Sequence, residues 1–207
     1  MNTFENLLIF EHVNHLTTMR LKSLIIICLL YFLSIAQGQD NVGLRLFGLS
    51  IHPHSEAENA AIMPLRLDPQ AYLVQNLGAI LSYERAIYRD VFSTKLALAL
   101  YSDCAARLGG FVHIGLRGRI FRAGRHSMYG GLGPTLIFRR NWLELADYKD
   151  QKLFKGSKQD RFQHLFLWYG GEFDYRYQIN QRLDGVISLI PGYPDLISLS
   201  VGINYKL

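Results

Sequence analysis

The sequence predicts an all-β protein, an eight-stranded antiparallel up-and-down transmembrane β-barrel. Three observations lead to this prediction: apolar and polar residues alternate at period two in eight segments, an export signal precedes them, and the links between segments alternate between short and long. Alternation at period two places one kind of side chain on each face of a strand. In a membrane barrel the apolar face meets lipid and the polar face lines the interior.

The first 38 residues are expected to be a signal peptide. Arg20 and Lys22 precede an apolar run at residues 24–33, and small residues follow, with cleavage expected near Ala36 or Gly38. A basic start, a short apolar core and small residues at the cut are the features of a secretion signal. The run is shorter than the roughly 20 residues that a spanning helix needs.

Met19 is expected to be the true start, because residues 1–18 form an acidic, mixed extension in front of the basic segment. Residues 39–207 are then expected to form a single barrel domain. Cys28 continues the apolar core of the signal, which leaves Cys104 alone in the mature chain. No intrachain disulfide is therefore expected, and stability must come from packing and backbone pairing.

The eight expected strands cover residues 42–51, 72–88, 92–103, 112–120, 128–142, 162–177, 183–190 and 197–207. The first three alternate around aliphatic positions: Val42, Leu44 and Leu46, then Leu77, Ala79, Leu81 and Tyr83, then Leu96, Leu98 and Leu100. In the fourth, aliphatic residues alternate with His113, Gly115, Arg117 and Arg119. A strand with that polar face does not suit an ordinary soluble core.

The fifth strand contains Pro134, which removes a backbone donor and predicts a bulge or bend. The sixth is expected to place Leu165 and Leu167 on the lipid side and His164 on the inner side. Several aromatic residues, Trp142 among them, are expected near the membrane interfaces. The closing strand runs to Leu207 and alternates at every position, with Lys206 on its polar face.

The links between these strands give an independent check. Those near residues 89–90, 123–126 and 180–182 are short, whereas the opposite set contains the two longest, at residues 52–70 and 143–161. Bacterial outer-membrane barrels have short periplasmic turns and longer outer loops. This alternation therefore predicts which end of the barrel faces outward.

Charged residues of both signs fall on the predicted inner faces. An eight-stranded barrel has an interior just wide enough for its own side chains. We therefore expect a salt-bridged polar core without an open channel, and the surplus of arginines also allows a small site for an anion such as phosphate or carboxylate in the barrel mouth. With Lys95, Asp103 and Lys206 on the same faces, the candidate lumen cluster is Arg45, Glu84, His113, Arg117, Arg119, Arg139, His164, Glu172, Asp174 and Arg176.

The pattern over residues 42–207 resembles the small eight-stranded outer-membrane barrels of Gram-negative bacteria, the OmpA-type and OmpX-type class and more distantly the lipid A deacylase barrels. The resemblance implies residence in the cell outer membrane after export, contact with outer-membrane lipid and lipopolysaccharide, and insertion by the outer-membrane machinery through the last strand. That strand usually ends in Phe or Trp in this class, whereas here it ends in Leu207. We expect a monomer that binds no nucleic acid and no cofactor.

Two residue groups invite chemical interpretations that their setting disfavours. His126 and Ser127 are adjacent, so in a strand they project to opposite faces and cannot form a nucleophile–base pair. His52, His54, Glu56 and Glu58 would suit a divalent metal only if their segment were extended, and Pro53 favours a solvated loop instead. No catalytic residue and no metal ligand is therefore assigned.

A structural or surface-interaction role is the function expected from these observations. Residues 143–161 alternate basic and acidic side chains and form a wet surface able to meet lipopolysaccharide phosphates or a partner. One alternative is a lipid-modifying barrel enzyme similar to the lipid A deacylases, since His164 and Glu172 lie near a membrane face. The other is a soluble barrel that binds a ligand inside, which would require apolar residues within and polar ones outside.

Overall fold

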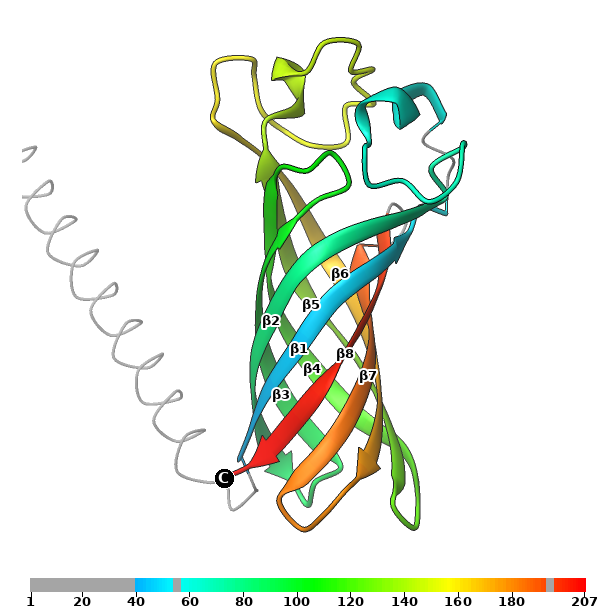
Figure 1. Cartoon of the computed structure of the whole chain (residues 1–207). Helices are drawn as coiled ribbons and strands as arrows, with labels where there is room; N and C mark the ends of the chain where they lie inside the picture. The colour runs from blue at the N-terminus through cyan, green and yellow to red at the C-terminus, as the bar shows by residue number, and fades with distance from the viewer. Residues whose placement is uncertain (1–39, 54–56, 193–195) are drawn as a thin grey trace, which may run out of the picture. The chain divides into compact units, whose positions relative to one another are not determined.

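The computed structural model describes residues 40–53, 57–192 and 196–207. Within them, eight antiparallel strands pair in chain order and close into a barrel, because β1 pairs with both β2 and β8 (Figure 1). This confirms the predicted fold class. The expected signal peptide, Met19 and Cys28 lie outside the described residues. The strands are β1 (Asp40–Ile51), β2 (Leu73–Tyr88), β3 (Phe92–Ser102), β4 (Leu108–Ala123), β5 (His126–Arg140), β6 (Phe162–Gln178), β7 (Leu183–Gly192) and β8 (Leu196–Lys206).

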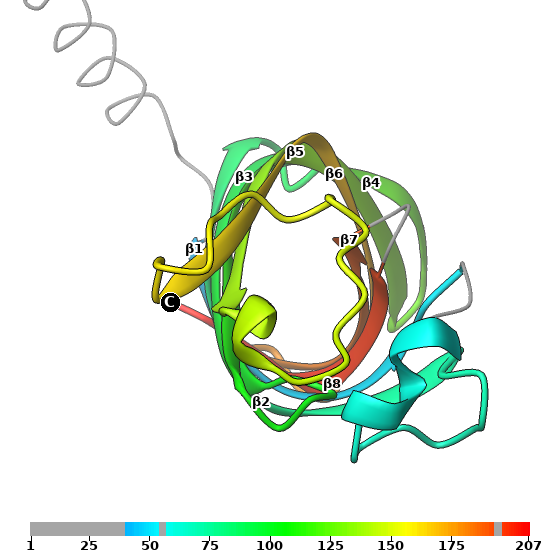
Figure 2. The same ribbon diagram turned by 90° about the horizontal axis from the view of Figure 1, so that it is seen from above.

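The two ends of the barrel differ in their connections. One end, here called the short-turn end, carries the β2–β3, β4–β5 and β6–β7 turns together with the start of β1 and the end of β8 (Figure 1). The other, the long-loop end, carries two 3-10 helices, η1 (Ala57–Ile62) and η2 (Trp142–Glu144). Viewed from above, the segment that contains η2 arches over the rim of the barrel (Figure 2). Within the described parts of the chain, no helix is long and apolar enough to cross a membrane.

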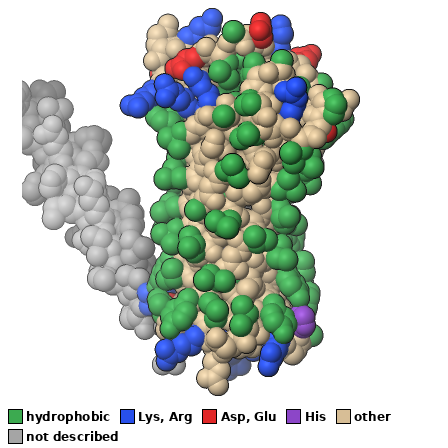
Figure 3. Space-filling model, viewed as in Figure 1, with side chains coloured by type: hydrophobic (Ala, Val, Ile, Leu, Met, Phe, Trp, Pro, Cys, Tyr) green, Lys and Arg blue, Asp and Glu red, His purple; other side chains and the backbone are tan. Residues whose placement is uncertain are grey.

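Side-chain exposure alternates along the strands as the sequence predicted. In β3, Leu96, Leu98 and Leu100 are exposed, whereas Ala97 and Ala99 between them are buried. The outward side chains are mainly aliphatic and aromatic, and they cover the visible barrel wall while charged groups gather at its two ends (Figure 3). The barrel is thus apolar outside and polar in part of its interior, the reverse of a water-soluble barrel.

A bulge interrupts β6 opposite Pro134. Gly133 pairs with Gly170, but Thr135 pairs with Leu167, so β6 carries one more residue than β5 over this stretch. The predicted irregularity at Pro134 is confirmed, and the extra residue lies in the partner strand.

The bulge reverses the alternation of β6 toward the long-loop end. Trp168 and Tyr169, which are consecutive, are both exposed, at 70% and 85%. Leu165 and Leu167 consequently pack against the apolar core, and His164 is exposed. The prediction that His164 faces the lumen was wrong, because one inserted residue moves every following side chain to the other face.

The interior of the barrel is divided into two layers along its axis. A charged layer, defined as Arg45, Glu84, Lys95, Arg117, Glu172, Asp174 and Arg176, is buried. An apolar layer, defined as Phe47, Ile80, Ala97, Ala99, Tyr101, Phe111 and Ile137, lies toward the long-loop end. In it the Phe47 and Tyr101 rings stack with centroids 4.5 Å apart. The expectation of a lumen filled throughout by paired charges therefore does not extend to this second layer.

Candidate functional site

Asp174 on β6 is the centre of the charged layer. Its Oδ2 atom lies 2.9 Å from Arg117 Nη2, 3.2 Å from Arg45 Nη2 and 3.3 Å from Lys95 Nζ. Arg176, two residues along the same strand face, adds a fourth cation at 3.2 Å. Removing a carboxylate from water is costly, and several cations at this distance compensate for the lost hydration.

Two glutamates complete the ionic contacts. Lys95 Nζ donates to Glu172 Oε2 at 2.6 Å, and Arg117 Nη1 donates to Glu84 Oε2 at 3.2 Å. Arg176 also donates to Glu84. The layer therefore contains four cationic and three anionic side chains, an excess of one positive charge in its interior.

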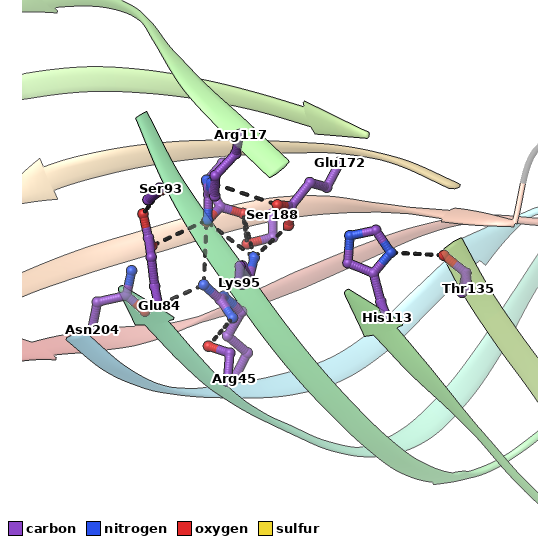
Figure 4. A network of polar contacts seen from close by, with 12 residues as sticks. Arg45, Glu84, Ser93, Lys95, His113, Arg117, Thr135, Glu172, Ser188 and Asn204 are labelled. Carbon is purple, nitrogen blue, oxygen red and sulfur yellow. Dashed lines mark hydrogen bonds and ion pairs between the residues drawn. The ribbon is translucent and has the colours of Figure 1, made fainter. Parts of the chain in front are cut away.

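Neutral side chains hydrogen-bond to members of the layer and connect it to further strands (Figure 4). Ser188 on β7 donates to Asp174 at 2.7 Å, and Ser93 on β3 donates to Glu84 at 2.6 Å. Arg45 donates to Ser82 on β2 at 2.9 Å and to Asn204 on β8 at 3.2 Å. Every strand except β5 contributes a side chain to these contacts, so they join strands that are distant along the chain.

β5 contributes no side chain to these ion pairs and hydrogen bonds, and it provides space instead. Gly131 on β5 faces the layer, and a Cβ atom there would lie 2.8 Å from Arg117 Cβ and 2.9 Å from Glu172 Oε1. Both distances are shorter than real Cβ contacts. Arg117 and Glu172 pair with Gly131 from the two flanking strands, so the glycine allows their side chains to approach each other over β5.

The structure brings together six of the ten predicted cluster residues: Arg45, Glu84, Arg117, Glu172, Asp174 and Arg176. His113 lies beside them and shares a hydrogen bond of 2.7 Å with Thr135. The other three lie elsewhere. Arg119 lines a cavity at the short-turn end, Arg139 lies at the long-loop end, and His164 is exposed outside.

A polar cavity of about 290 Å³ lies between the charged layer and the short-turn end. Its lining includes Arg119, Arg122 and Arg125, together with Glu84 and Arg176 of the charged layer. Lys206, predicted to face inward, also lines it and forms an ion pair with Asp184 at 3.0 Å. The charged layer thus forms the inner boundary of this opening.

A second cavity, of about 80 Å³, lies at the long-loop end and is here called the mouth cavity. It is lined by side chains from β2, β3, β5 and β6 and from both long links. Arg139 and Asp103, two of the predicted inward residues, line it. Trp142 lines it too and is 4% exposed, so its predicted position at the membrane interface was wrong.

Asp103 lies in the link between β3 and β4 and connects this link to Trp142 in the wall of the mouth cavity. Its carboxylate accepts hydrogen bonds from the Trp142 indole at 2.8 Å and from the backbone amides of Ala105 and Arg107 at 3.0 and 2.8 Å. Burial nevertheless raises the pKa of the Asp103 carboxyl. The hydrogen bond from the indole to the Asp103 carboxylate orients Trp142, which lies in the link between β5 and β6.

The residue groups that invited chemical interpretations are not assembled into a site within the part of the chain that the structure describes. His126 contacts the Tyr175 hydroxyl at 2.5 Å on the outside, whereas Ser127 lines the cavity at the short-turn end. Among the described residues, no group of three or more His, Cys, Asp or Glu side chains is placed to hold a metal. Of the proposed loop ligands, His54 and Glu56 lie outside that part of the chain, and His52 binds the Ala71 carbonyl at 3.0 Å.

No family model and no curated protein matches the chain. Among solved structures, it is similar to the N-terminal β-barrel domain of Pseudomonas aeruginosa OprF, with 13% identity, 83% of this chain and 100% of that chain covered, and a TM-score of 0.46. For Yersinia pestis Ail, the attachment invasion locus protein, the values are 10%, 82%, 97% and 0.46. For the outer membrane protein OprG of P. aeruginosa they are 15%, 82%, 96% and 0.48. These barrels are what the chain is similar to in fold.

Proposed function

We propose that this chain is a monomeric outer-membrane β-barrel protein with a structural or surface-contact role, in which the charged layer closes the lumen. The observation that carries the proposal is the distribution of side chains: aliphatic and aromatic groups point outward from the strands, and the charged layer is buried within. Lipid satisfies an apolar exterior, and a closed barrel leaves no backbone group of its strands unpaired in the membrane.

The long-loop end is the proposed contact surface. Residues 147–161 carry exposed side chains of both signs, including Lys149, Lys152 and Lys158. Such a surface suits the phosphates and sugars of lipopolysaccharide, which is the outer-leaflet partner that we propose. The short-turn end would then face the periplasm, and the last strand would be the part that the insertion machinery engages.

The charged layer argues against conduction. Its members keep side-chain exposures of 6% or less, and the carboxylates and cations contact one another across the barrel. Planar-bilayer recordings of the purified protein are expected to show no stable channel. Steady single-channel currents in the wild-type protein would contradict the closed lumen.

Two alternative functions, a lipid-modifying barrel enzyme and a soluble ligand-binding barrel, are less well supported. His164 is exposed outside whereas Glu172 binds Lys95 inside, so these two side chains do not form the polar site that a lipid-modifying barrel enzyme would need. A soluble ligand-binding barrel requires a polar exterior, whereas Leu98 and Ile114 are exposed on this one.

Cell fractionation with a heat-modifiability gel tests membrane residence. We expect the protein in the outer-membrane fraction, with a mobility that changes on boiling. Cysteine substitutions then test the orientation of the wall: Leu98→Cys should react with a lipid-soluble maleimide, and the neighbouring Ala97→Cys, which is 2% exposed, should not. A soluble periplasmic product, or equal labelling of both positions, would overturn the proposal.

A further inference from the structure

Arg139 lies in an aromatic cage at the wall of the mouth cavity. Its guanidinium carbon is 4.0 Å from the centroid of Trp142 and 3.9 Å from that of Phe154. Nε donates to Gln163 Oε1 at 3.1 Å, and Nη2 donates to the Tyr148 hydroxyl at 2.8 Å. Aromatic faces stabilise a cation but accept no strong in-plane hydrogen bond from it. The cage therefore fixes the guanidinium without using all of its donors.

The cation has no carboxylate partner among the described residues, and no ion pair joins Arg139 to any of them. A guanidinium has five N–H donors, and two of its nitrogens make the bonds above while Nη1 makes none to this part of the chain. The acid in the same cavity, Asp103, already accepts three hydrogen bonds. The donors that remain on Arg139 fit an external carboxylate, which arginine binds through paired N–H groups.

Two further polar atoms of the cavity wall lack a partner. The Tyr101 hydroxyl makes no hydrogen bond within the described residues, although Tyr101 is only 6% exposed. Asn76 is 2% exposed, and its Oδ1 atom is buried without a partner while its amide donates to Ser50. Buried polar groups are normally hydrogen-bonded. The Tyr101 hydroxyl can donate to an anion in the cavity, whereas Asn76 Oδ1 only accepts and would need a donor such as water.

Apolar side chains form the rest of the cavity, including Met63, Ile137, Leu153 and Leu165. Its volume of about 80 Å³ holds several water molecules or one organic molecule of a few heavy atoms. We propose that the mouth cavity binds a small organic acid. Arg139 holds the carboxylate, the Tyr101 hydroxyl adds a hydrogen bond, and the apolar wall takes a short hydrocarbon body.

Fluorescence of Trp142 provides a direct test, because Trp142 stacks on Arg139 and the chain has two tryptophans. In the Trp168→Phe protein, inserted into phospholipid nanodiscs, Trp142 is the single reporter. Sodium butyrate is expected to change its emission saturably at millimolar concentrations, whereas 1-butanol and butylammonium, which share the hydrocarbon body, are not. Equal responses to the acid and the alcohol, or no saturable response to butyrate, would overturn the proposal.

Paired arginine variants identify the cation that binds. In the same background, Arg139→Gln is expected to weaken butyrate binding about tenfold or more, since hydrogen bonds to charged groups are the strong ones. Arg140→Gln, on the neighbouring and exposed residue, is the matched control and should bind as the parent does. A similar loss in both variants would overturn the assignment. Tyr101→Phe keeps the ring that stacks on Phe47, and it should weaken butyrate binding by a smaller factor.

Discussion

The charged layer and the apolar layer lie in one cylinder and are built on the same strands, yet different forces hold them. On β3, Lys95 belongs to the charged layer, and Ala99 and Tyr101 further along the strand belong to the apolar one. The outward residues between them stay aliphatic throughout. Lipid thus constrains the exterior uniformly, whereas the interior is free to change its chemistry along the axis.

This difference has an energetic consequence. In the charged layer, each carboxylate must match its cations, because an unpaired buried charge costs several kcal/mol. In the apolar layer only shape and volume must match, and small changes are tolerated. The two layers should therefore respond very differently to substitutions of similar size.

The largest effect is expected from Asp174→Asn. This change keeps the shape of the side chain but leaves four cations around a neutral group, so the free energy of unfolding should fall by about 3–5 kcal/mol. The urea midpoint of the heat-modifiable folded form in detergent micelles measures it. Glu144→Gln is the control at an exposed ion pair with Arg107, where about 0–1 kcal/mol is expected. Equal losses in the two variants would contradict the special status of the charged layer.

A smaller effect is expected from filling the space at Gly131. Gly131→Ala should cost about 1–3 kcal/mol, because the added methyl group meets Arg117 Cβ at 2.8 Å. The same unfolding titration serves as the measurement. Gly171→Ala on the adjacent strand is the control, since its Cβ would meet Leu132 at an ordinary 3.4 Å. If Gly131→Ala is as stable as Gly171→Ala, the charged layer is less tightly packed around Gly131 than the 2.8 Å distance indicates.

The smallest effect is expected within the apolar layer. Ile137→Val removes one methylene from a residue that is 5% exposed, and it should cost about 0.5–1.5 kcal/mol. Ile114→Val makes the same change on the outer wall, where the side chain is 55% exposed, and should be close to neutral in micelles. A larger cost at Ile114 than at Ile137 would mean that the wall, and not the apolar layer, carries the packing energy.

Periodicity was enough to predict the strands and most of the charged layer. Arg45, Lys95 and Arg117 each lie within an uninterrupted alternating run, so their inward orientation follows from the parity of their positions. His164 was misplaced because the register shift lies between it and the rest of that run. Pro134 lies on β5, but the extra residue of the bulge lies on β6. The pattern of a single strand does not show which of two paired strands carries the extra residue.

A small anion site in the barrel mouth was among the expectations, but the side chains that build the mouth cavity were not predictable, for a different reason. Arg139 and Asp103 were recognised as inward residues, but Trp142 and Tyr148 reach them only because residues 141–161 fold back over the rim. That link is held by contacts such as the paired hydrogen bonds between the backbones of Lys155 and His164. Such contacts follow no short period, and the chemistry of a site built from loops depends on them.

The charged layer also ties the first strand of the barrel to strands that come much later in the chain. Arg45 near the start of the described chain binds Asp174 and Asn204, which are 129 and 159 residues away. These contacts form only when β1 meets β8, so an open sheet would present an arginine and a carboxylate that still require water. Closing the chain over such distances costs entropy before these contacts can form. The ionic contacts therefore bridge the seam between the first and last strands, so closing that seam and pairing these buried charges belong to the same event.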